Sequence, residues 1–366
     1  MTDKHSDFMA LALDLAREGQ GRTRPNPPVG AIVVRDQRVV GEGYHSRAGE
    51  PHAEIFALRA AGDSAQGAEL YVTLEPCCHT GRTGPCTDAI IDAGIKRVFI
   101  GVVDPDPRVS GQGIARLEKA GLSVEVGILD KPCRELIAPF AHHVRTGCPL
   151  ILYKGAVTLD GVTATRTGDA KWVSCEESRV QVHQLRNQVD AIMVGIGTVL
   201  ADNPRLTTRL PGETRNPDRI IVDSKLRIPL DAAVLNQHAD CQVIVATTDQ
   251  ADLDNLERLR ALGTTVLILP GDDHGSVDVE CLSAELGKRD YQYIMLEGGA
   301  LLARSLWHAR LIQKVRFYLA PKIYAGDDGT GLFAGQGAER MIDAESLNNV
   351  RYSQCGSDIV IEGDVA

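Results

Sequence analysis

The sequence predicts an α/β protein with two domains, each built around a mainly parallel sheet. Short β-branched runs alternate with helical patterns along the chain, and such alternation favours a parallel sheet covered on both faces. The chain has 366 residues, and at roughly 150 residues per domain this length suffices for two separate cores. A proline-containing segment at 131–149 interrupts the alternation. We therefore expect domains at 1–148 and 149–366.

In the first half, apolar positions recur at helical spacing from residue 8 onward, and β-branched runs follow. A hairpin is expected where two such runs are separated only by Arg35-Asp36-Gln37. Pro51 is compatible with a first helical turn, where a missing N–H leaves no bond unmade. The predicted elements are a helix at 8–17, strands at 29–34 and 38–44, a helix at 51–61, a strand at 70–74, a helix at 86–93, a strand at 97–103, a helix at 111–120, a strand at 123–129 and a crossing segment at 131–149.

In the second half, the alternation restarts at Leu150. The run Ser174-Cys175-Glu176-Glu177 has the pattern of a capping box, in which the Ser hydroxyl and the Glu carboxylate satisfy each other's backbone donors. The predicted elements are a strand at 150–157, a helix from the capping box towards 189, and strands at 191–194, 219–222, 242–246, 265–269, 293–296, 315–320 and 358–362.

Composition and charge exclude several classes of protein. Hydrophobic residues make up 43% and charged residues 24%, which excludes disordered and fibrous classes. The formal charge of −10 argues against a nucleic-acid-binding surface, although a few local arginines can still hold one phosphate. No apolar stretch approaches the roughly 20 residues of a membrane span, and no signal-peptide pattern is present. We expect a cytoplasmic protein whose nine cysteines are free thiols or metal ligands.

The strongest chemical signal combines His52-Ala53-Glu54, Pro76-Cys77 and Cys86. Catalytic zinc usually takes three protein ligands and leaves a fourth position for water, whose pKa it lowers from about 15.7 to about 7. Glu54 lies two residues from a ligand and can relay a proton, as in the zinc deaminases. We therefore predict one Zn²⁺ per chain, bound by His52, Cys77 and Cys86, with Glu54 as the catalytic acid and base.

A structural zinc site is the alternative. Cys77 and Cys86 could bind zinc with His52 and His79, although this leaves Glu54 without a role. Such a zinc-stabilised interaction module would unfold without its metal, whereas a catalytic site would only lose activity.

Three motifs of the first half occur together in one known family. They are Asn26-Pro27-Pro28-Val29-Gly30, His52-Ala53-Glu54 and the loop at 75–86, which reads EPCCHTGRTGPC. With them the chain resembles the bifunctional riboflavin biosynthesis proteins of the RibD family, which join a pyrimidine deaminase to a pyrimidine reductase. The loop departs from the family pattern at Cys78, where Ser is common, and at Gly84, where Pro is common. Neither departure removes a ligand.

The resemblance implies a cytidine-deaminase-like, three-layer first domain. In it, Asn26 would hydrogen-bond the heterocycle, while His45 and His79 would line the pocket. Cys78 is expected to be a neighbour of the metal site and not a ligand, because adjacent residues rarely both face one ion.

Motifs of the second half extend the resemblance over nearly the whole chain. They are found at 154–161 (KGAVTLDG), 197–204 (GTVLADNP) and 297–300 (EGGA). The resemblance implies a dihydrofolate-reductase-like domain that binds NADPH, although the sequence shows no clear anchor for a 2′-phosphate. The implied NADPH contacts are Ala156, Trp172, Thr198, Asp202, Gly298, Gly299, Ala300, Leu301, Leu302, Ala303 and Arg304. The implied substrate contacts are Lys154, Asp160, Ala170, Arg186, Leu206, Arg209 and Glu297.

Residue chemistry is compatible with these implied roles. The Gly298-Gly299 pair follows a predicted strand, and glycines there let backbone N–H groups approach a pyrophosphate at a helix N-terminus. Arg186 and Arg209 suit a ribose 5-phosphate, because the guanidinium fork matches phosphate oxygens in pairs. The resemblance places Lys154 and Asp160 near the reacting ribose.

The family resemblance implies two consecutive reactions on one phosphorylated pyrimidine, without nucleic acid or membrane partners. The first is hydrolytic deamination of 2,5-diamino-6-ribosylamino-4(3H)-pyrimidinone 5′-phosphate, and the second is NADPH-dependent reduction of the ribosyl group to ribityl. A nucleoside or tRNA-base deaminase fused to an unrelated domain is the alternative, against which the long Cys77–Cys86 spacing and the acidic charge argue. We also expect a homo-oligomer, either a dimer or a tetramer.

Overall fold

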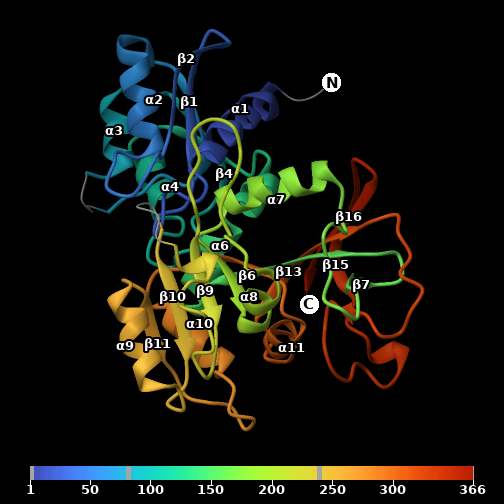
Figure 1. Ribbon diagram of the computed structural model, residues 1–366. Coiled ribbons are helices and arrows are strands. Elements are labelled where there is room, and N and C mark those ends of the chain that lie inside the picture. Colours follow the sequence, from blue (N-terminus) through green and yellow to red (C-terminus); the bar gives the residue numbers. More distant parts are fainter. Residues whose placement is uncertain (1–3, 80–83, 237–240, 366) are drawn as a thin grey trace. The chain divides into compact units, whose positions relative to one another are not determined.

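The computed structural model describes residues 4–79, 84–236 and 241–365. The chain divides into two compact units, Met1–Gly147 and Cys148–Ala366 (Figure 1). None of the helices in the described ranges combines the length and the apolar character that a bilayer crossing requires.

Unit 1 is a five-stranded sheet with helices on both faces. Its elements are α1 (Lys4–Glu18), β1 (Gly30–Arg35), β2 (Arg38–Tyr44), α2 (Ala53–Ala61), η1 (Gly62–Ala65), β3 (Glu69–Leu74), α3 (Cys86–Asp92), β4 (Arg97–Val102), α4 (Gln112–Lys119), β5 (Ser123–Val126), α5 (Asp130–Leu136) and α6 (Ala138–Thr146). The strand order is β2-β1-β3-β4-β5. The pairings of β1 are antiparallel and those among β3, β4 and β5 are parallel, so this sheet is mixed and not mainly parallel as expected.

The alternation of side chains along β1 divides the core of unit 1 into two layers. Ala31 and Val33 belong to the cluster that α2, α3 and α4 cover. Ile32 and Val34 belong to the cluster that α1 and α5 cover. Successive strand residues point to opposite faces of a sheet. The buried strand β1 therefore contributes side chains to both core layers, and helices cover both faces of the sheet.

Two local predictions for unit 1 were wrong. The helix expected from Pro51 begins at Ala53, with His52 as its N-cap, because the proline stays outside the helix. The crossing segment contains two regular helices, α5 and α6, which were not predicted. Pro132 and Pro139 lie in the first turns of these helices, where the missing N–H has no helical partner in any case.

Unit 2 is a nine-stranded sheet with a small additional ribbon. Its elements are β6 (Leu150–Val157), β7 (Val162–Ala164), α7 (Glu176–Gln188), β8 (Ala191–Gly195), α8 (Ile196–Asp202), β9 (Asp218–Val222), η2 (Ala233–Leu235), β10 (Val243–Thr247), α9 (Leu253–Ala261), β11 (Thr265–Ile268), α10 (Val279–Gly287), β12 (Tyr293–Glu297), α11 (Ala300–His308), β13 (Ile312–Leu319), β14 (Thr330–Gly331), η3 (Met341–Asp343), β15 (Leu347–Cys355) and β16 (Asp358–Val365). The order of the large sheet is β11-β10-β9-β8-β12-β6-β13-β16-β15.

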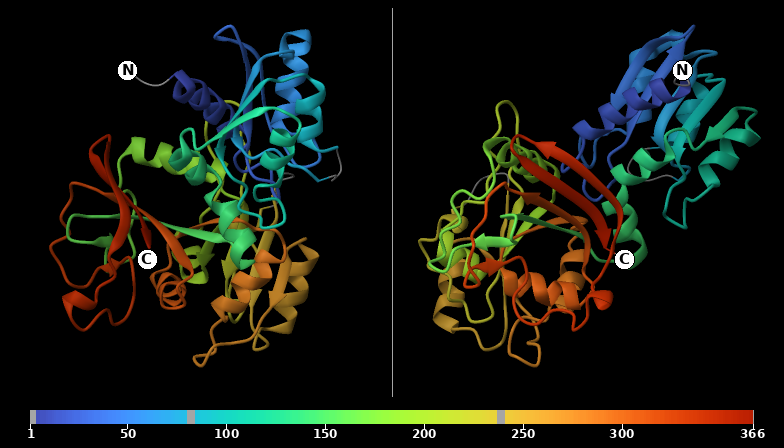
Figure 2. Two further views of the ribbon diagram at one scale, coloured as in Figure 1. Left: turned by 180° about the vertical axis from the view of Figure 1, so that it is seen from behind. Right: turned by 90° about the vertical axis from the view of Figure 1, so that its right-hand side faces the viewer.

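The large sheet is parallel from β11 to β13, as expected, and ends in the antiparallel pair β16–β15 (Figure 2). The strand β12 lies between β6 and β8, although it follows both in the chain. This places the carboxyl ends of β6, β12 and β8 side by side, and ligands of open parallel sheets bind outside such ends.

The capping box predicted before α7 is not formed. The helix begins at Glu176 with Cys175 as N-cap, whose side chain caps no backbone N–H of the helix, although its Sγ lies 3.3 Å from the Ser178 hydroxyl. Asp358 replaces it, because its Oδ2 accepts hydrogen bonds from the Cys175 backbone N–H at 2.9 Å and from the Ser178 hydroxyl at 2.7 Å. A buried carboxylate from β16 therefore caps this helix.

Candidate functional site

His52, Cys77 and Cys86 converge on one point in unit 1. His52 precedes α2, Cys77 follows the end of β3, and Cys86 is the first residue of α3. The His52 Nδ1 lies 3.3 Å from the Cys86 Sγ and 3.6 Å from the Cys77 Sγ. Among the described residues, this is the single group of three or more His, Cys, Asp or Glu side chains whose ligand atoms lie close enough to share a metal ion.

The spacing of these three donor atoms fits tetrahedral zinc. With Zn–S near 2.3 Å and Zn–N near 2.0 Å, neighbouring ligands of a tetrahedral site lie about 3.5–3.8 Å apart, close to the distances found here. The Cys86 backbone N–H donates to the Cys77 Sγ at 3.4 Å. Hydrogen bonds from Cys86, opposed by burial, lower the pKa of the Cys77 thiol to about 4. These hydrogen bonds favour the thiolate form of Cys77, which is the form that binds zinc.

Glu54 lies in the first turn of α2, two residues beyond His52, and its side chain is only 3% exposed. Burial raises the pKa of its carboxyl group, and the nearby imidazole of His52 opposes this effect. The carboxyl group also lies beside the Cys86 thiol. A buried carboxyl group with a raised pKa can both accept and donate a proton near neutrality.

Asn26 and His45 form a fixed pair next to the metal ligands. The Asn26 Nδ2 lies 3.0 Å from the His45 Nε2, and the His45 Nδ1 lies 3.1 Å from the Pro51 carbonyl oxygen. Since a carbonyl only accepts, Nδ1 carries the proton and Nε2 accepts from Asn26. Burial lowers the pKa of His45, which favours this neutral form. The rings of His45 and His52 lie 5.3 Å apart, centre to centre.

His79 is exposed and is not part of the donor group formed by His52, Cys77 and Cys86. It interacts electrostatically with Asp104 and Asp106, from the loop after β4. Burial raises the pKa of Asp104 to about 6. The sequence gives no signal for this carboxyl group, because it lies in the loop directly after the strand predicted at 97–103.

In unit 2, Arg186 and Glu297 form a buried, bidentate ion pair. The Arg186 Nε and Nη2 donate to the two Glu297 carboxylate oxygens at 2.7 and 2.8 Å, and Nη1 donates to the Thr207 carbonyl at 2.9 Å. Both side chains are 11% exposed. Burial raises the pKa of Glu297, but the charge and hydrogen bonds of Arg186 outweigh it and lower the value to about 2. The donors of Arg186 are thus directed at protein oxygens.

Lys154 and Arg209 are the other cations of this cluster. Lys154 on β6 is paired in register with Glu297 on β12. Burial lowers the pKa of the Lys154 ammonium group, and the charge of Glu297 opposes this. Arg209 is exposed, and its Nη1 donates to the Thr207 hydroxyl at 3.1 Å. Of the two arginines expected at a phosphate, Arg209 has the more accessible guanidinium group.

The remaining expected substrate contacts differ in accessibility. Asp160 is exposed, but its carboxylate accepts hydrogen bonds from the Thr158 hydroxyl at 2.6 Å and from the Tyr324 and Ala325 backbone N–H groups. It thereby holds the loop after β13 against the turn after β6. Leu206 is 3% exposed and belongs to a core cluster, and Ala170 is half-buried.

The turn between β12 and α11 has the form expected of a cofactor loop. Gly298 and Gly299 have φ angles of +81° and +85°, a region that side chains other than glycine rarely adopt. A Cβ atom at Gly298 would lie 3.3 Å from the Thr198 hydroxyl on α8. The turn, α8 and the end of β8 therefore adjoin one another at the carboxyl edge of the sheet.

The other expected cofactor residues lie around this turn or on the facing loops. Asp202 ends α8, and Ala156 and Ala300 are half-buried. Leu302 and Ala303 are core residues that α11 packs against the sheet, whereas Leu301 is 72% exposed and Arg304 lies against Gly335. Trp172 is 60% exposed, and the Arg179 guanidinium lies 4.8 Å from its ring centre.

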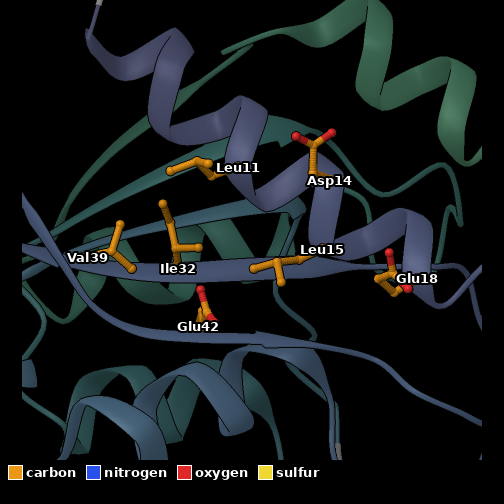
Figure 3. Close-up of a pocket in the computed structure, with 7 residues that line it drawn as sticks. All are labelled: Leu11, Asp14, Leu15, Glu18, Ile32, Val39 and Glu42. Atoms are coloured by element: carbon orange, nitrogen blue, oxygen red, sulfur yellow. The ribbon is translucent and has the colours of Figure 1, made fainter.

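A separate pocket of about 280 Å³ lies between α1 and the β1–β2 hairpin (Figure 3). Its lining combines apolar side chains such as Leu11 and Val39 with the carboxylates of Asp14, Glu18 and Glu42. None of the expected site residues lines it.

Comparison with known proteins covers both units. Residues 2–102 match the cytidine and deoxycytidylate deaminase zinc-binding region, and residues 149–361 match the RibD C-terminal domain. The chain is 44% identical over 352 residues to the riboflavin biosynthesis protein RibD of Bacillus amyloliquefaciens, covering 96% of this chain and 94% of that protein. It is 39% identical to the Escherichia coli RibD, covering 97% of both chains. The chain belongs to the RibD family.

Solved RibD structures extend this likeness to three dimensions. RibD of Acinetobacter baumannii (form 1) superposes with a TM-score of 0.87 at 34% identity, covering 99% of both chains. A Thermotoga maritima structure, titled as a diaminohydroxyphosphoribosylaminopyrimidine deaminase and 5-amino-6-(5-phosphoribosylamino)uracil reductase, superposes with a TM-score of 0.86 at 35% identity, again covering 99% of both. The resemblance and the fold class expected from the motifs are confirmed.

A further cysteine, Cys78, follows Cys77 directly. The Cys78 Sγ lies 4.0 Å from the Gln112 Oε1 on α4 and is not part of the donor group of His52, Cys77 and Cys86. Burial raises the pKa of the Cys78 thiol, whereas that of Cys77 is lowered. The two adjacent thiols therefore differ in where their sulfur atoms lie and in the direction in which their pKa is shifted.

Proposed function

We propose that the chain is a bifunctional enzyme of riboflavin biosynthesis. Residues 1–148 would deaminate 2,5-diamino-6-ribosylamino-4(3H)-pyrimidinone 5′-phosphate, and residues 149–366 would then reduce its ribosyl group to ribityl with NADPH. The observation that carries the proposal is the convergence of His52, Cys77 and Cys86 beside the buried Glu54, in a RibD-family chain that has both halves.

The deaminase half combines three candidate zinc ligands with one residue that transfers protons. His52, Cys77 and Cys86 would hold zinc, which would lower the pKa of a water molecule towards neutrality. Glu54 would carry one proton from the attacking water to the ring nitrogen and a second proton from the added hydroxyl group to the departing amine, two transfers that suit its raised pKa. Asn26, fixed by the neutral His45, presents its amide to the heterocycle.

The reductase half places charge and a cofactor turn at the carboxyl edge of the large sheet. A nicotinamide cofactor supplies the hydride, and we propose NADPH over the Gly298-Gly299 turn, with Thr198 facing it. Lys154 stands beside the reacting ribose, where its lowered pKa makes the ammonium group a ready proton donor. Arg209 binds the 5′-phosphate, while Glu297 keeps Arg186 in place.

Product analysis tests the proposal directly. The purified protein is incubated with the diaminopyrimidinone phosphate, with and without NADPH, and the products are identified by mass. Without NADPH, we expect exchange of one amino group for oxygen together with release of ammonia. With NADPH, we expect a further gain of two hydrogen atoms. Deamination of cytidine or of tRNA in place of this substrate would overturn the assignment.

Removal of the metal separates a catalytic site from a structural one. We expect a chelator to abolish ammonia release while unit 1 stays folded, because its apolar clusters lie on both faces of the sheet and do not depend on the ion. Circular dichroism and thermal melting of the metal-free protein measure this. Added zinc should restore activity, whereas unfolding of unit 1 by the chelator would indicate a structural ion.

An alanine at Gly298 tests the cofactor turn. The left-handed backbone costs about 1–2 kcal/mol for a residue with a side chain, and the new Cβ would crowd the Thr198 hydroxyl. We expect Gly298→Ala to raise the KM for NADPH about tenfold or more and to leave deamination unchanged. Gly212→Ala is the matched control, since Gly212 has a φ of +85° but open space around it. Equal KM values in the two variants would contradict the assignment.

We also propose a homo-oligomer, a dimer or a tetramer, and a cytoplasmic location. Light scattering coupled to size-exclusion chromatography measures the first, and a monomer at micromolar concentration would contradict it.

A further inference from the structure

Glu75 is a buried carboxylate directly before the Pro76-Cys77 pair. It follows the last residue of β3, and its side chain is 3% exposed. The reaction proposed above assigns it no task. An ionised carboxylate is costly to bury unless hydrogen bonds satisfy it, so the partners of Glu75 indicate what it does.

Four backbone N–H groups of one downstream segment donate to this carboxylate. The Glu75 Oε2 accepts from Asp104 at 3.1 Å and from Gly111 at 3.0 Å. The Glu75 Oε1 accepts from Gly113 at 2.9 Å and from Ile114 at 3.2 Å. Because Gly113 and Ile114 lie in the first turn of α4, the carboxylate satisfies N–H groups that have no helical partner. It joins the end of β3 to the start of α4.

The backbone of α4 also touches the cysteine segment directly. A Cβ atom at Gly113 would lie 2.1 Å from the Pro76 carbonyl oxygen, so only glycine fits at this position without a shift. The residue that precedes Cys77 is thus pressed against the helix that Glu75 caps. The position of Cys77 consequently depends on the position of α4.

Arg116, on the same helix, connects both thiol-bearing segments. Its Nη1 donates to the Cys78 carbonyl oxygen at 3.3 Å, and its Nη2 forms an ion pair with Asp88. Asp88 lies in the first turn of α3, which begins with Cys86. One guanidinium group therefore bridges the segment of Cys77 and the helix of Cys86.

We propose that Glu75 and Arg116 are positioning residues, which hold the Cys77 and Cys86 sulfurs at the separation that zinc requires. The inference rests on the proposed zinc deaminase function, and it adds α4 as the support for two of its three ligands. Residues that contact metal ligands without binding the ion themselves contribute about 10–100-fold to metal affinity. Neither residue contacts the substrate or the ion.

The experiment measures zinc affinity and ligand geometry in the full-length protein. Zinc affinity is obtained by competition with a chromophoric chelator, and the geometry from the visible spectrum of the Co²⁺-substituted protein, whose bands report thiolate ligation. We expect Arg116→Met to weaken zinc binding about tenfold and Glu75→Gln about 10–100-fold, both with altered Co²⁺ bands. Arg116→Lys, which keeps a cation for Asp88 and the Cys78 carbonyl, should recover most of the affinity.

Arg134→Met is the matched control, because Arg134 is also an exposed arginine of unit 1 in an ion pair, with Asp130 on α5. It should keep the zinc affinity and spectrum of the unsubstituted protein. NADPH oxidation on the deaminated substrate should be unchanged in all variants.

The outcomes separate the inference from the function on which it rests. Unchanged zinc affinity and Co²⁺ bands in Arg116→Met and Glu75→Gln would overturn the inference, even if the melting temperature fell. Failure of the unsubstituted protein to bind zinc would instead overturn the proposed function. Should Glu75→Gln not fold, the Arg116 variants decide, because that side chain is 44% exposed and its replacement leaves the core intact.

Discussion

Replacement of Glu54 by glutamine is expected to lower deaminase turnover by about 10²–10⁴-fold. Glutamine has nearly the same shape but cannot take up and return a proton, so the transfer to the ring nitrogen and the amine is lost. The zinc ligands are His52, Cys77 and Cys86 in our proposal, and none of them is altered. Zinc content should therefore remain one per chain, as determined by elemental analysis.

The control for this experiment is Glu42→Gln, at an exposed glutamate on β2 of the same unit. It should release ammonia at the unsubstituted rate. NADPH oxidation on the deaminated substrate should stay intact in both variants, since the reductase residues lie in unit 2. Unchanged ammonia release by Glu54→Gln would remove Glu54 from the mechanism, and loss of zinc would instead assign it to the metal site.

The three candidate zinc ligands were predictable because the local sequence places each of them beside the end of a helix or strand. His52 and Cys86 adjoin helix starts, and Cys77 follows a strand end through a proline. Strand and helix order predicts that such ends meet at one edge of a sheet. Elements with strong apolar patterns were likewise predicted to within a few residues, such as β6 at Leu150–Val157.

The overlooked features depend on partners that are distant in sequence or on positions with little apolar character. Asp358 caps a helix that begins more than 180 residues earlier, and it takes the place of the capping box predicted from the local sequence. Glu75 bonds backbone groups up to 39 residues away, which leave no signal in side-chain identity. The strand β15 was not predicted, because most of its side chains are exposed and its sequence is largely polar.

Arg186 illustrates how packing modifies a role inferred from residue type. The guanidinium fork that suits a phosphate also suits a carboxylate. In this structure its Nε and Nη2 both donate to the Glu297 carboxylate. The two residues are 111 positions apart, and no local pattern pairs them. Only the placement of β12 between β6 and β8 brings the carboxylate to the arginine.

Replacement of Glu297 by glutamine is expected to destabilise unit 2 by about 3–5 kcal/mol, because it leaves Arg186 as a buried charge without its counter-ion. Lys154 loses the same neighbour, so its pKa should fall further. Differential scanning calorimetry of the full chain measures the change. Reductase activity should also fall, since both cations line the proposed substrate site.

Acid should remove the same stabilisation from the unsubstituted protein. The pKa of Glu297 is about 2 in the folded state, against an ordinary value of 4.5 for a glutamate, so the folded state holds this proton less tightly. The resulting stability is present above the unfolded pKa and is lost as pH falls from about 5 to about 2, by about 3 kcal/mol. In Glu297→Gln this part of the acid dependence should be absent.

Glu362→Gln is the matched control for both experiments. Glu362 pairs with Arg316 on the same sheet, but its side chain is 24% exposed, and ion pairs at such exposure contribute about 1 kcal/mol or less. If both variants melted alike at neutral pH, Glu297 would not be the buried counter-charge on which the geometry of the reductase site depends.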